Sequence, residues 1–505
     1  MVNHLIYLYH SWHSANQMKN FQVAIVGGGV IGSAIAWELS KHAVDVVVFE
    51  KGSDVASGAS KANSGVIHSG INSAHLSLKA RFCVEGNQLF QSLADDLGFQ
   101  VHWIGKYVIA KKEDEIKELE SLQKVGRKNK VLHLKITNGA SVKSKEPNVA
   151  CHAALWVPTA GITEPYEFTI VLAENAAENK VKFLLETKVV DLKKQKDCFI
   201  IKTNKGDFQA QLVVNAAGLN CREIVSMLEE PNFHVYPCRG EYLVLDKNYR
   251  SLIKSMIYPV PEKDSGVLGV HLTPTIEGNI LVGPSAEFID DLDDKRTTKE
   301  TMKTLFNKAK EIIPTLPNNA VINAYAGIRC KLASSKEGGW ADYRIEESKT
   351  TSGLINLLGI ESPGLTAAPA IAKEITQMIA QHIDLKFKET FKPRKKKGKR
   401  FSELSGQEQA TLIKKDERWG RIVCRCEQVT EMEIIQALSN PLGAKTISSV
   451  KYRCRAGMGR CQGGFCTQHI LKIMEKQFGM NINDIKLRSP DSNLFYGRTR
   501  GVKDE

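Results

Sequence analysis

Near the beginning of the chain, the apolar pattern changes from strand-like to helical and back. Residues 21–27 form a short apolar run that ends in glycines, and residues 33–42 repeat their apolar positions as a helix does. Residues 44–50 are rich in β-branched side chains, which favour a strand. This order predicts a strand, a tight turn, a helix and a second strand, as in a nucleotide-binding α/β sheet.

Further apolar runs predict strands in the middle of the chain. Those expected in the nucleotide-binding half are residues 212–215 and 354–359, and those expected in a second, more β-rich half are residues 106–111, 243–245 and 266–272. The two sets interleave along the sequence. We therefore expect an α/β protein whose second half is a mixed β-sheet inserted into the first.

A glycine motif stands at the predicted tight turn. Gly27, Gly29 and Gly32 fit the G-x-G-x-x-G spacing, in which they permit the turn, let a pyrophosphate approach the backbone and let the helix pack close to the sheet. Glu50 ends the second strand, 18 residues after Gly32, where its carboxylate can accept hydrogen bonds from a ribose. The sequence predicts a dinucleotide site, and the acid at Glu50 disfavours the 2′-phosphate of NADP.

Composition narrows the class of protein. The net charge of +13 suits acidic partners, anionic substrates or an anionic membrane surface, and no nucleic-acid-binding motif accompanies it. No apolar run is long enough to span a bilayer. Of the eleven cysteines, five lie within residues 424–466, and the others are scattered without a pairing pattern. This distribution indicates a reducing compartment with one metal site, and we expect a cytoplasmic protein.

A basic segment separates the main part of the chain from the cysteine-rich region. Residues 393–400 are almost all charged, which predicts a solvated linker, or alternatively a patch that contacts a membrane surface or a partner. Ser405 and Glu408 then form a capping box that opens a short helix.

Two close pairs of cysteines, Cys424 with Cys426 and Cys461 with Cys466, flank a predicted helical hairpin. They can bring four thiolates to one site, which suits either a [2Fe-2S] cluster or a structural zinc ion. Cys454 is expected to be a reduced cysteine that binds no metal. The region from about residue 419 to 480 resembles the [2Fe-2S] domain of bacterioferritin-associated-ferredoxin type, and this resemblance implies an iron–sulfur cluster.

Three other segments resemble one superfamily: SGASKANSGVIHSG at 57–70, VVNAAG at 213–218 and GIESPGLTAAPA at 359–370. They are similar to the flavin-binding segments of the D-amino-acid-oxidase-like proteins. More narrowly, they resemble FAD-dependent glycerol-3-phosphate dehydrogenases and oxidases and L-2-hydroxyglutarate oxidases. The resemblance implies FAD as the cofactor, and the FAD-contacting residues that it adds to Gly27, Gly29, Gly32 and Glu50 are Ser57, Ser60, Ser64, Gly65, Ala217, Gly218, Gly364 and Leu365.

The same resemblance implies the substrate site. His68 matches the family's catalytic histidine, which would take the hydroxyl proton, and Arg329 matches its substrate-binding arginine, whose guanidinium suits a carboxylate or phosphate. Arg239, His271 and Ser362 are weaker candidates for contact with the substrate. The expected substrate is a small anionic hydroxy compound, and the expected electron acceptor is a protein or a quinone.

The substrate indications divide. The region around Thr297, the 360–370 segment and the added cysteine module resemble glycerol-3-phosphate dehydrogenases. Residues 258–261 and 268–271, and Cys330 after Arg329, look more like L-2-hydroxyglutarate oxidases, and Leu268 stands where a phosphate-side lysine is expected. We rank glycerol 3-phosphate first, L-2-hydroxyglutarate second and an amino acid or amine third. A non-enzymatic redox or iron-handling protein is the rival from another class.

The expected organisation has five parts. They are a disordered extension (1–20), the FAD-dependent domain with its interleaved substrate region (21–385), the basic linker with a short helix (386–418), a small helical [2Fe-2S] domain (419–480) and a tail (481–505). A peripheral contact with the inner face of a membrane through the linker is the alternative to a purely cytoplasmic location.

Overall fold

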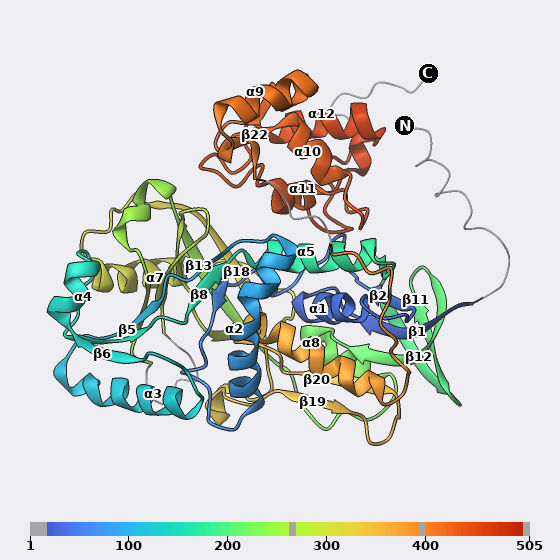
Figure 1. The fold of residues 1–505 in the computed structure, drawn as a ribbon, viewed down its shortest axis with the longest axis horizontal. Helices are drawn as coiled ribbons and strands as arrows, with labels where there is room; N and C mark the ends of the chain where they lie inside the picture. The colour runs from blue at the N-terminus through green and yellow to red at the C-terminus, as the bar shows by residue number, and fades with distance from the viewer. Residues whose placement is uncertain (1–17, 262–268, 394–398, 498–505) are drawn as a thin grey trace.

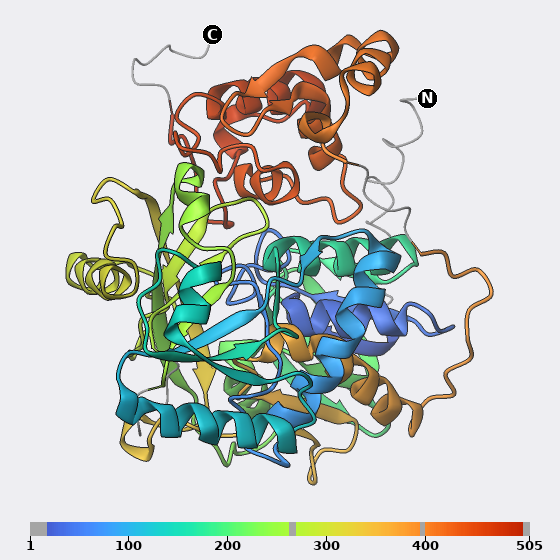
Figure 2. The same cartoon turned by 60° about the vertical axis from the view of Figure 1, so that its left-hand side comes forward.

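The computed structural model describes residues 18–261, 269–393 and 399–497. An eight-stranded sheet and a nine-stranded sheet lie side by side, and a small helical module formed by the C-terminal part of the chain lies over both (Figures 1 and 2). Residues 1–17, which contain most of the expected N-terminal extension, lie outside the described residues.

The eight-stranded sheet carries the glycine-rich turn. β1 (Lys19–Val26) lies between β2 (Val46–Phe49) and β12 (Gly206–Asn215), and all three run parallel. α1 (Val30–Leu39) follows β1, so the predicted strand, turn, helix and strand are confirmed, although the helix begins at Val30 rather than at residue 33. The other strands of this sheet are β9 (Lys182–Leu184), β10 (Val189–Gln195), β11 (Cys198–Thr203), β19 (Arg344–Glu347) and β20 (Leu354–Leu358).

Both faces of this sheet are buried, which explains why its central strands are continuously apolar. Val23 and Ile25 of β1 face a core shared with α1, α2 (Leu78–Leu97), α5 (Pro165–Glu178) and α8 (Gly364–Ala380). Ala24 and Val26 face the opposite side, where β10 and β11 complete a second cluster. At Gly86 of α2 a Cβ atom would lie 2.0 Å from the carbonyl oxygen of Thr366, so α2 and α8 cross closely there.

The nine-stranded sheet is mixed, as expected. Its strands are β5 (Lys106–Ala110), β6 (Lys135–Asn138), β7 (Ala153–Val157), β13 (Tyr236–Leu245), β14 (Met256–Pro259), β15 (His271–Pro274), β16 (Ile280–Gly283), β17 (Glu287–Phe288) and β18 (Val321–Lys331). β14 runs parallel to β5, whereas β14 and β15, β15 and β16, and β13 and β18 are antiparallel. α7 (Lys299–Ile312) covers one face through Leu305 and Ala309. Residues 262–268, including Leu268 and the first three residues of the strand predicted at 266–272, lie outside the described residues.

The cysteine module is helical. Its helices are α9 (Gly406–Lys415), α10 (Glu431–Leu438), α11 (Ile447–Cys454) and α12 (Thr467–Phe478), and its two short strands are β21 (Ile422–Cys424) and β22 (Val429–Thr430). The predicted capping box at Ser405 and Glu408 is present at the start of α9. Ile434, Val450, Ile470 and Met474 form its core.

Three segments near the expected domain boundaries pack against the rest of the chain. Lys19 and Asn20, expected to belong to the extension, pair with β12. In the linker, Lys392 exchanges backbone hydrogen bonds with the side chain of Asn179, and Arg400 forms an ion pair with Glu277 at 2.8 Å; residues 394–398 lie outside the described residues. In the tail, Ile485 is fully buried in the core of the module.

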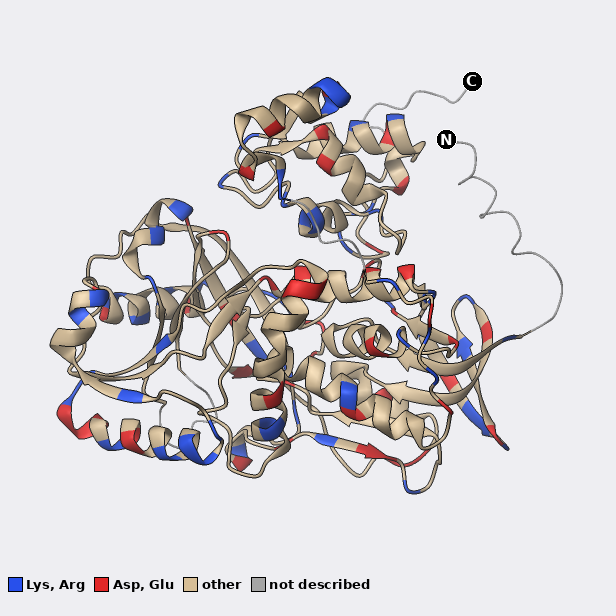
Figure 3. Ribbon diagram, viewed as in Figure 1, with Lys and Arg blue, Asp and Glu red and all other residues tan. Residues whose placement is uncertain are grey.

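The surface charge is mixed along α3 (Ile116–Lys128), an exposed helix of the β-rich half. Lysines, arginines and glutamates alternate along this helix, as Figure 3 shows, and the buried Leu119 on its other side packs with Leu155 of β7. Among the described helices, none combines the length and the apolar character needed to cross a bilayer.

Candidate active site

A large cavity lies where the two sheets and the cysteine module meet. Its volume is about 2150 Å³, and its lining comes from the glycine-rich turn, the 57–70 loop, β18, the start of α8 and the 455–463 segment of the module. Small-molecule sites commonly occupy about 300–1,000 Å³. The cavity therefore has room for a dinucleotide and a small substrate together.

The glycine-rich turn and Glu50 form one end of the cavity. Gly27 adopts φ +113°, and a Cβ on Gly32 would lie 1.9 Å from the carbonyl oxygen of Gly27, so both positions require glycine. Glu50 is buried at the end of β2, and its carboxylate accepts hydrogen bonds from the N–H groups of Gly28 at 2.8 Å and Gly52 at 2.7 Å. Burial raises the pKa of Glu50, and these two N–H groups oppose the shift.

These residues fit FAD. Gly29 lines the cavity at the N-terminus of α1, and a Cβ atom there would lie 3.1 Å from the hydroxyl of Ser60, so a side chain would crowd the gap between this turn and the 57–70 loop. Free N–H groups at this helix end suit a pyrophosphate. Glu50 lines the same cavity, as expected for a carboxylate that binds a ribose.

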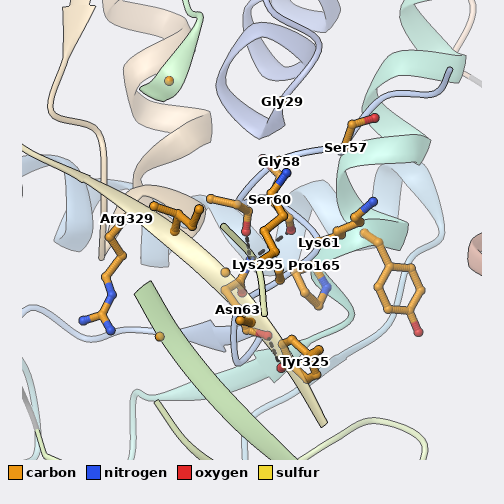
Figure 4. Close-up of a pocket in the computed structure, with 18 of the residues that line it drawn as sticks. Gly29, Ser57, Gly58, Ser60, Lys61, Asn63, Pro165, Lys295, Tyr325 and Arg329 are labelled. Atoms are coloured by element: carbon orange, nitrogen blue, oxygen red, sulfur yellow. Dashed lines mark hydrogen bonds between the residues drawn. The ribbon is translucent and has the colours of Figure 1, made fainter. Parts of the chain in front are cut away.

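The 57–70 loop crosses the middle of the cavity. In Figure 4, Ser60 lies near the centre, with Arg329 on one side and Lys61 on the other. The hydroxyl of Ser60 accepts a hydrogen bond from Val30 N at 2.8 Å, and Ser57, Ser60 and Ser64 all line the cavity. Gly65 does not line it; with φ +66° and only 2.2 Å between its would-be Cβ and the carbonyl oxygen of Thr163, this glycine shapes the loop.

His68 faces the cavity from the end of this loop. Its backbone N–H donates to the hydroxyl of Thr366 at 2.9 Å, and its Nε2 lies 3.4 Å from the hydroxyl of Ser362. Burial, with smaller contributions from Lys106 and His271, lowers the pKa of His68 well below its ordinary value. The imidazole is therefore neutral at neutral pH and can accept a proton.

His271 presents a second neutral imidazole to the cavity. Its ring stacks on Tyr258 with centroids 3.9 Å apart, and its Nδ1 lies 3.1 Å from the carbonyl oxygen of Gly269. That contact requires a proton on Nδ1, which leaves Nε2 as an acceptor. Nε2 is buried and has no hydrogen-bond partner in the described structure. Burial lowers the pKa of His271 to about 3.

Arg329 extends from β18 into the cavity, opposite a glycine. A Cβ atom at Gly240 of β13 would lie 2.6 Å from Nη2 of Arg329, so Gly240 leaves room for the guanidinium. Nη2 donates to the carbonyl oxygen of Ser285, and no carboxylate among the described residues forms an ion pair with Arg329. The charge of Arg329 is therefore available to an anionic ligand.

Arg239 does not join this group. It is absent from the cavity lining and is almost fully buried, with ion pairs at 2.6 Å to both Asp294 and Glu287. The structure therefore gives Arg239 a structural place, and the expectation that it contacts substrate is not supported. In the sequence the two arginines could not be ranked by geometry, because only the pairing of β13 with β18 shows which one faces the cavity.

The remaining predicted residues line the cavity from two further segments. Ser362, Gly364 and Leu365 lie at the start of α8. Ala217 and Gly218 follow β12, where Gly218 adopts φ +58°. The segments 57–70, 213–218 and 359–370, far apart in the sequence, are thus brought to one cavity.

The four cysteines of the module form two pairs. The sulfur atoms of Cys426 and Cys461 are 3.5 Å apart, and Cys424 interacts with Cys466. The Cys466 thiol, followed by the backbone N–H groups of Gly457 and Glu427, lowers the pKa of Cys424 to about 6. Two pairs of thiols fit a binuclear iron–sulfur cluster, in which each iron takes two protein ligands.

The two ends of this cysteine group differ in exposure. Cys424 and Cys466 are buried, whereas Cys426 is exposed. Phe465, next to Cys466, is 76% exposed. Cys454 is buried and hydrogen-bonded to the carbonyl oxygen of Val450.

Several functional positions were not predicted from the sequence. Gly327 allows the 57–70 loop to approach β18, because a Cβ there would lie 2.1 Å from the carbonyl oxygen of Ala62. Thr366 positions His68, and Lys106 lines the cavity. Thr366 lies within the quoted 359–370 segment, and Lys106 is a charged residue at the start of an otherwise apolar strand, which is the only sequence signal that it carries.

Comparisons with known proteins agree with this geometry. Residues 22–378 match the family described as FAD dependent oxidoreductase (DAO), and residues 422–476 match the BFD-like [2Fe-2S] binding domain. The chain belongs to the FAD dependent oxidoreductase family. Its cofactors are FAD and, in the C-terminal module, a [2Fe-2S] cluster.

Individual relatives extend the comparison. Glycerol 3-phosphate dehydrogenase of Caloramator mitchellensis is 40% identical over 485 residues, which cover 95% of this chain and 99% of that protein. The mitochondrial L-2-hydroxyglutarate dehydrogenase of Arabidopsis thaliana is 30% identical over 71% of this chain and 83% of its own. The dithionite-reduced, FAD-bound L-alpha-glycerophosphate oxidase of Mycoplasma pneumoniae superposes with a TM-score of 0.71 and 29% identity, covering 76% of this chain and all of that one.

Replacing Glu50 tests the dinucleotide end of the cavity. Glu50→Gln removes the charge but keeps a similar shape, so we expect FAD to dissociate about 10-fold to 100-fold more readily, as a hydrogen bond to a charged group contributes about 1.5–3 kcal/mol. The measurement is equilibrium dialysis with fluorescence of the released flavin. Asp45→Asn, an exposed carboxylate just before β2, is the control and should bind FAD normally. Unchanged FAD affinity in Glu50→Gln would exclude the ribose contact.

Proposed function

We propose that the protein oxidises sn-glycerol 3-phosphate to dihydroxyacetone phosphate and passes the electrons through FAD and the [2Fe-2S] cluster to a further acceptor. The observation that carries this proposal is the similarity to a glycerol 3-phosphate dehydrogenase over nearly the whole of both chains, including the cysteine module. The cavity supports it by combining a neutral His68 with Arg329, whose charge is not paired with any carboxylate among the described residues.

The residues of the chain have distinct proposed roles. Arg329 binds the anionic group of the substrate and so orients it. His68, neutral and half-buried, takes the proton of the substrate hydroxyl at Nε2, where the substrate hydroxyl replaces the hydroxyl of Ser362 that lies 3.4 Å from this nitrogen. His271 accepts a hydrogen bond from the substrate at Nε2, which has no partner among the described residues. FAD, when bound, supplies the acceptor for the hydride that leaves the carbon.

L-2-hydroxyglutarate is the second candidate substrate. The relative in Arabidopsis thaliana acts on it by name, and a carboxylate suits the guanidinium of Arg329 as well as a phosphate does. Both candidates are secondary alcohols with anionic groups, so the chemistry at His68 is the same for either. Solved structures of lower identity, such as a glycine oxidase at 22%, support the fold only.

The electron acceptor is proposed to approach the exposed side of the cysteine group. Cys426 is exposed and Phe465 offers an apolar surface beside it, whereas Cys424 and Cys466 are buried. A protein or quinone acceptor would meet the cluster there. A peripheral membrane contact near the basic segment 393–400 belongs to the same proposal.

A panel of compounds tests the substrate. Under anaerobic conditions, sn-glycerol 3-phosphate should bleach the flavin absorbance faster than L-2-hydroxyglutarate, and L-proline should leave it unchanged. Stopped-flow absorbance gives the limiting rate and the half-saturating concentration for each compound. Bleaching by L-2-hydroxyglutarate alone would replace the proposed substrate, and bleaching by L-proline alone would replace the reaction class.

Replacing His68 tests the proposed base. His68→Gln should lower the limiting rate of flavin reduction by about 10²–10⁴-fold, the range for loss of a general base. His102→Gln, an exposed histidine outside the cavity, should reduce its flavin normally.

The pH dependence follows from the lowered pKa of His68. Since the imidazole must be neutral to accept a proton, the wild-type rate should stay constant from pH 8 down to about 6.5, the ordinary histidine value, and decline only below it. If His68→Gln reduces its flavin at the wild-type rate in the preceding experiment, His68 is not the base.

A further inference from the structure

Lys106 is a buried cation without a carboxylate partner. It opens β5 with 1% of its surface exposed and lines the cavity. Its ammonium lies 3.4 Å from the side-chain oxygen of Asn72 and 4.6 Å from the ring centroid of Tyr258. No ion pair to it occurs within the described ranges. Burial of a charge is costly unless the charge is paired, which points to a ligand that supplies the partner.

The other buried lysines of the cavity are different. Lys79 and Lys331 both form ion pairs with Glu361, at 2.9 Å and 3.2 Å. One carboxylate thus offsets part of their charge and bridges α2, β18 and the segment before α8. Lys106 instead has a neutral amide, an aromatic ring and the buried thiol of Cys83 near it, and no carboxylate among the described residues pairs with it. Of the buried lysines described in the cavity wall, Lys106 is therefore the one left for an anionic ligand.

The sheet places Lys106 in a row with His271. Lys106 pairs with Met256 of β14, so Tyr258, two residues further along β14, points to the same face. Ile257 pairs with Leu272 of β15, which brings His271 opposite Tyr258. The stacked rings of Tyr258 and His271, 9° from parallel, continue the row. One wall of the cavity therefore presents an ammonium, an aromatic ring and an unpartnered imidazole nitrogen.

Electrostatics connect this row with the rest of the site. Lys106 contributes to lowering the pKa of both His68 and His271, and Arg329 contributes at His271. These groups are therefore near enough to influence one another. Two cations without carboxylate partners, Lys106 and Arg329, face one cavity together with two neutral histidines. Their combined charge is best matched by a ligand that carries two negative charges.

We propose that Lys106 is a specificity-determining residue that, with Arg329, binds the oxyanion groups of a dianionic hydroxy substrate. The inference rests on the proposed oxidation of a hydroxy compound and adds the charge that the substrate must carry. A phosphate monoester has close to two negative charges at neutral pH, and a dicarboxylate has two. Glycerol, without charge, and L-lactate, with one carboxylate, should therefore be poor substrates.

Binding of oxidation-resistant anions tests this site directly. The perturbation of the flavin absorbance is titrated with inorganic phosphate and, separately, with glutarate, in the FAD-loaded full chain. Lys106→Met, which preserves length but removes the charge, should raise the dissociation constant of the tighter-binding probe about 10-fold to 100-fold. Lys106→Arg should stay within about tenfold of the wild type. Lys145→Met, an exposed lysine beside the Trp156 ring, is the matched control and should bind normally.

Kinetics separate binding from a structural role. With sn-glycerol 3-phosphate and L-2-hydroxyglutarate, Lys106→Met should raise the half-saturating concentration by a similar factor while the limiting rate of flavin reduction changes little. Lys106→Gln repeats both measurements if Lys106→Met does not retain FAD. The preference of the wild type for phosphate or glutarate identifies which oxyanion the site takes.

Three results would decide whether Lys106 binds the anionic groups of the substrate. Wild-type affinity for both probes in Lys106→Met overturns the proposal, and so does loss of FAD from all three Lys106 variants, because the ammonium would then serve the fold. If neither hydroxy compound bleaches the flavin but Lys106→Met still weakens probe binding, the proposed substrate fails while the anion site at Lys106 is supported.

Discussion

The position of the cysteine module against the flavin-binding half depends on the buried ion pairs of Arg453. Arg453 belongs to α11 of the cysteine module, and its guanidinium reaches Glu174 of α5 at 2.7 Å and Asp54 at 3.1 Å. All three side chains are buried. Removing one partner from such a group commonly costs about 3–5 kcal/mol, because a charge is left buried and unpaired. The module is therefore tied to the flavin-binding half through Asp54, four residues after Glu50.

A second arginine continues this connection to the thiols. Arg455 donates to Glu427 at 3.0 Å and to the hydroxyl of Tyr166 at 2.8 Å. Glu427 follows Cys426 directly and also binds Lys247 of the β-rich half at 2.9 Å. The cysteine group is thus positioned by contacts with both sheets. This arrangement explains how one cavity can be lined by the flavin-binding loops and by the module, although the basic segment separates them in sequence.

Part of the fold and of the site could be predicted from the sequence, because it depends on residues that are close together in the chain. The glycine turn, Glu50 and the capping boxes depend on residues close in sequence, and the four cysteines stand out by spacing. The row of Lys106, Tyr258 and His271 depends on the register of β5 with β14, which begins at residue 256 whereas β5 begins at residue 106, and on the register of β14 with β15. No local sequence pattern carries that information. Likewise, the run of charges predicted a solvated linker, but charge alone does not reveal that Arg400 forms an ion pair with Glu277.

The central claim is that the flavin cavity and the cysteine module act as one electron-transfer enzyme. The most direct test compares Cys461→Ser with Cys454→Ser, a buried cysteine outside the group of four, in anaerobic flavin reduction by substrate and in turnover with a one-electron acceptor. The account predicts that Cys461→Ser loses the cluster signal in electron paramagnetic resonance and most of its acceptor turnover but still reduces its flavin. Cys454→Ser should retain all three. Normal acceptor turnover in cluster-free Cys461→Ser would contradict the account.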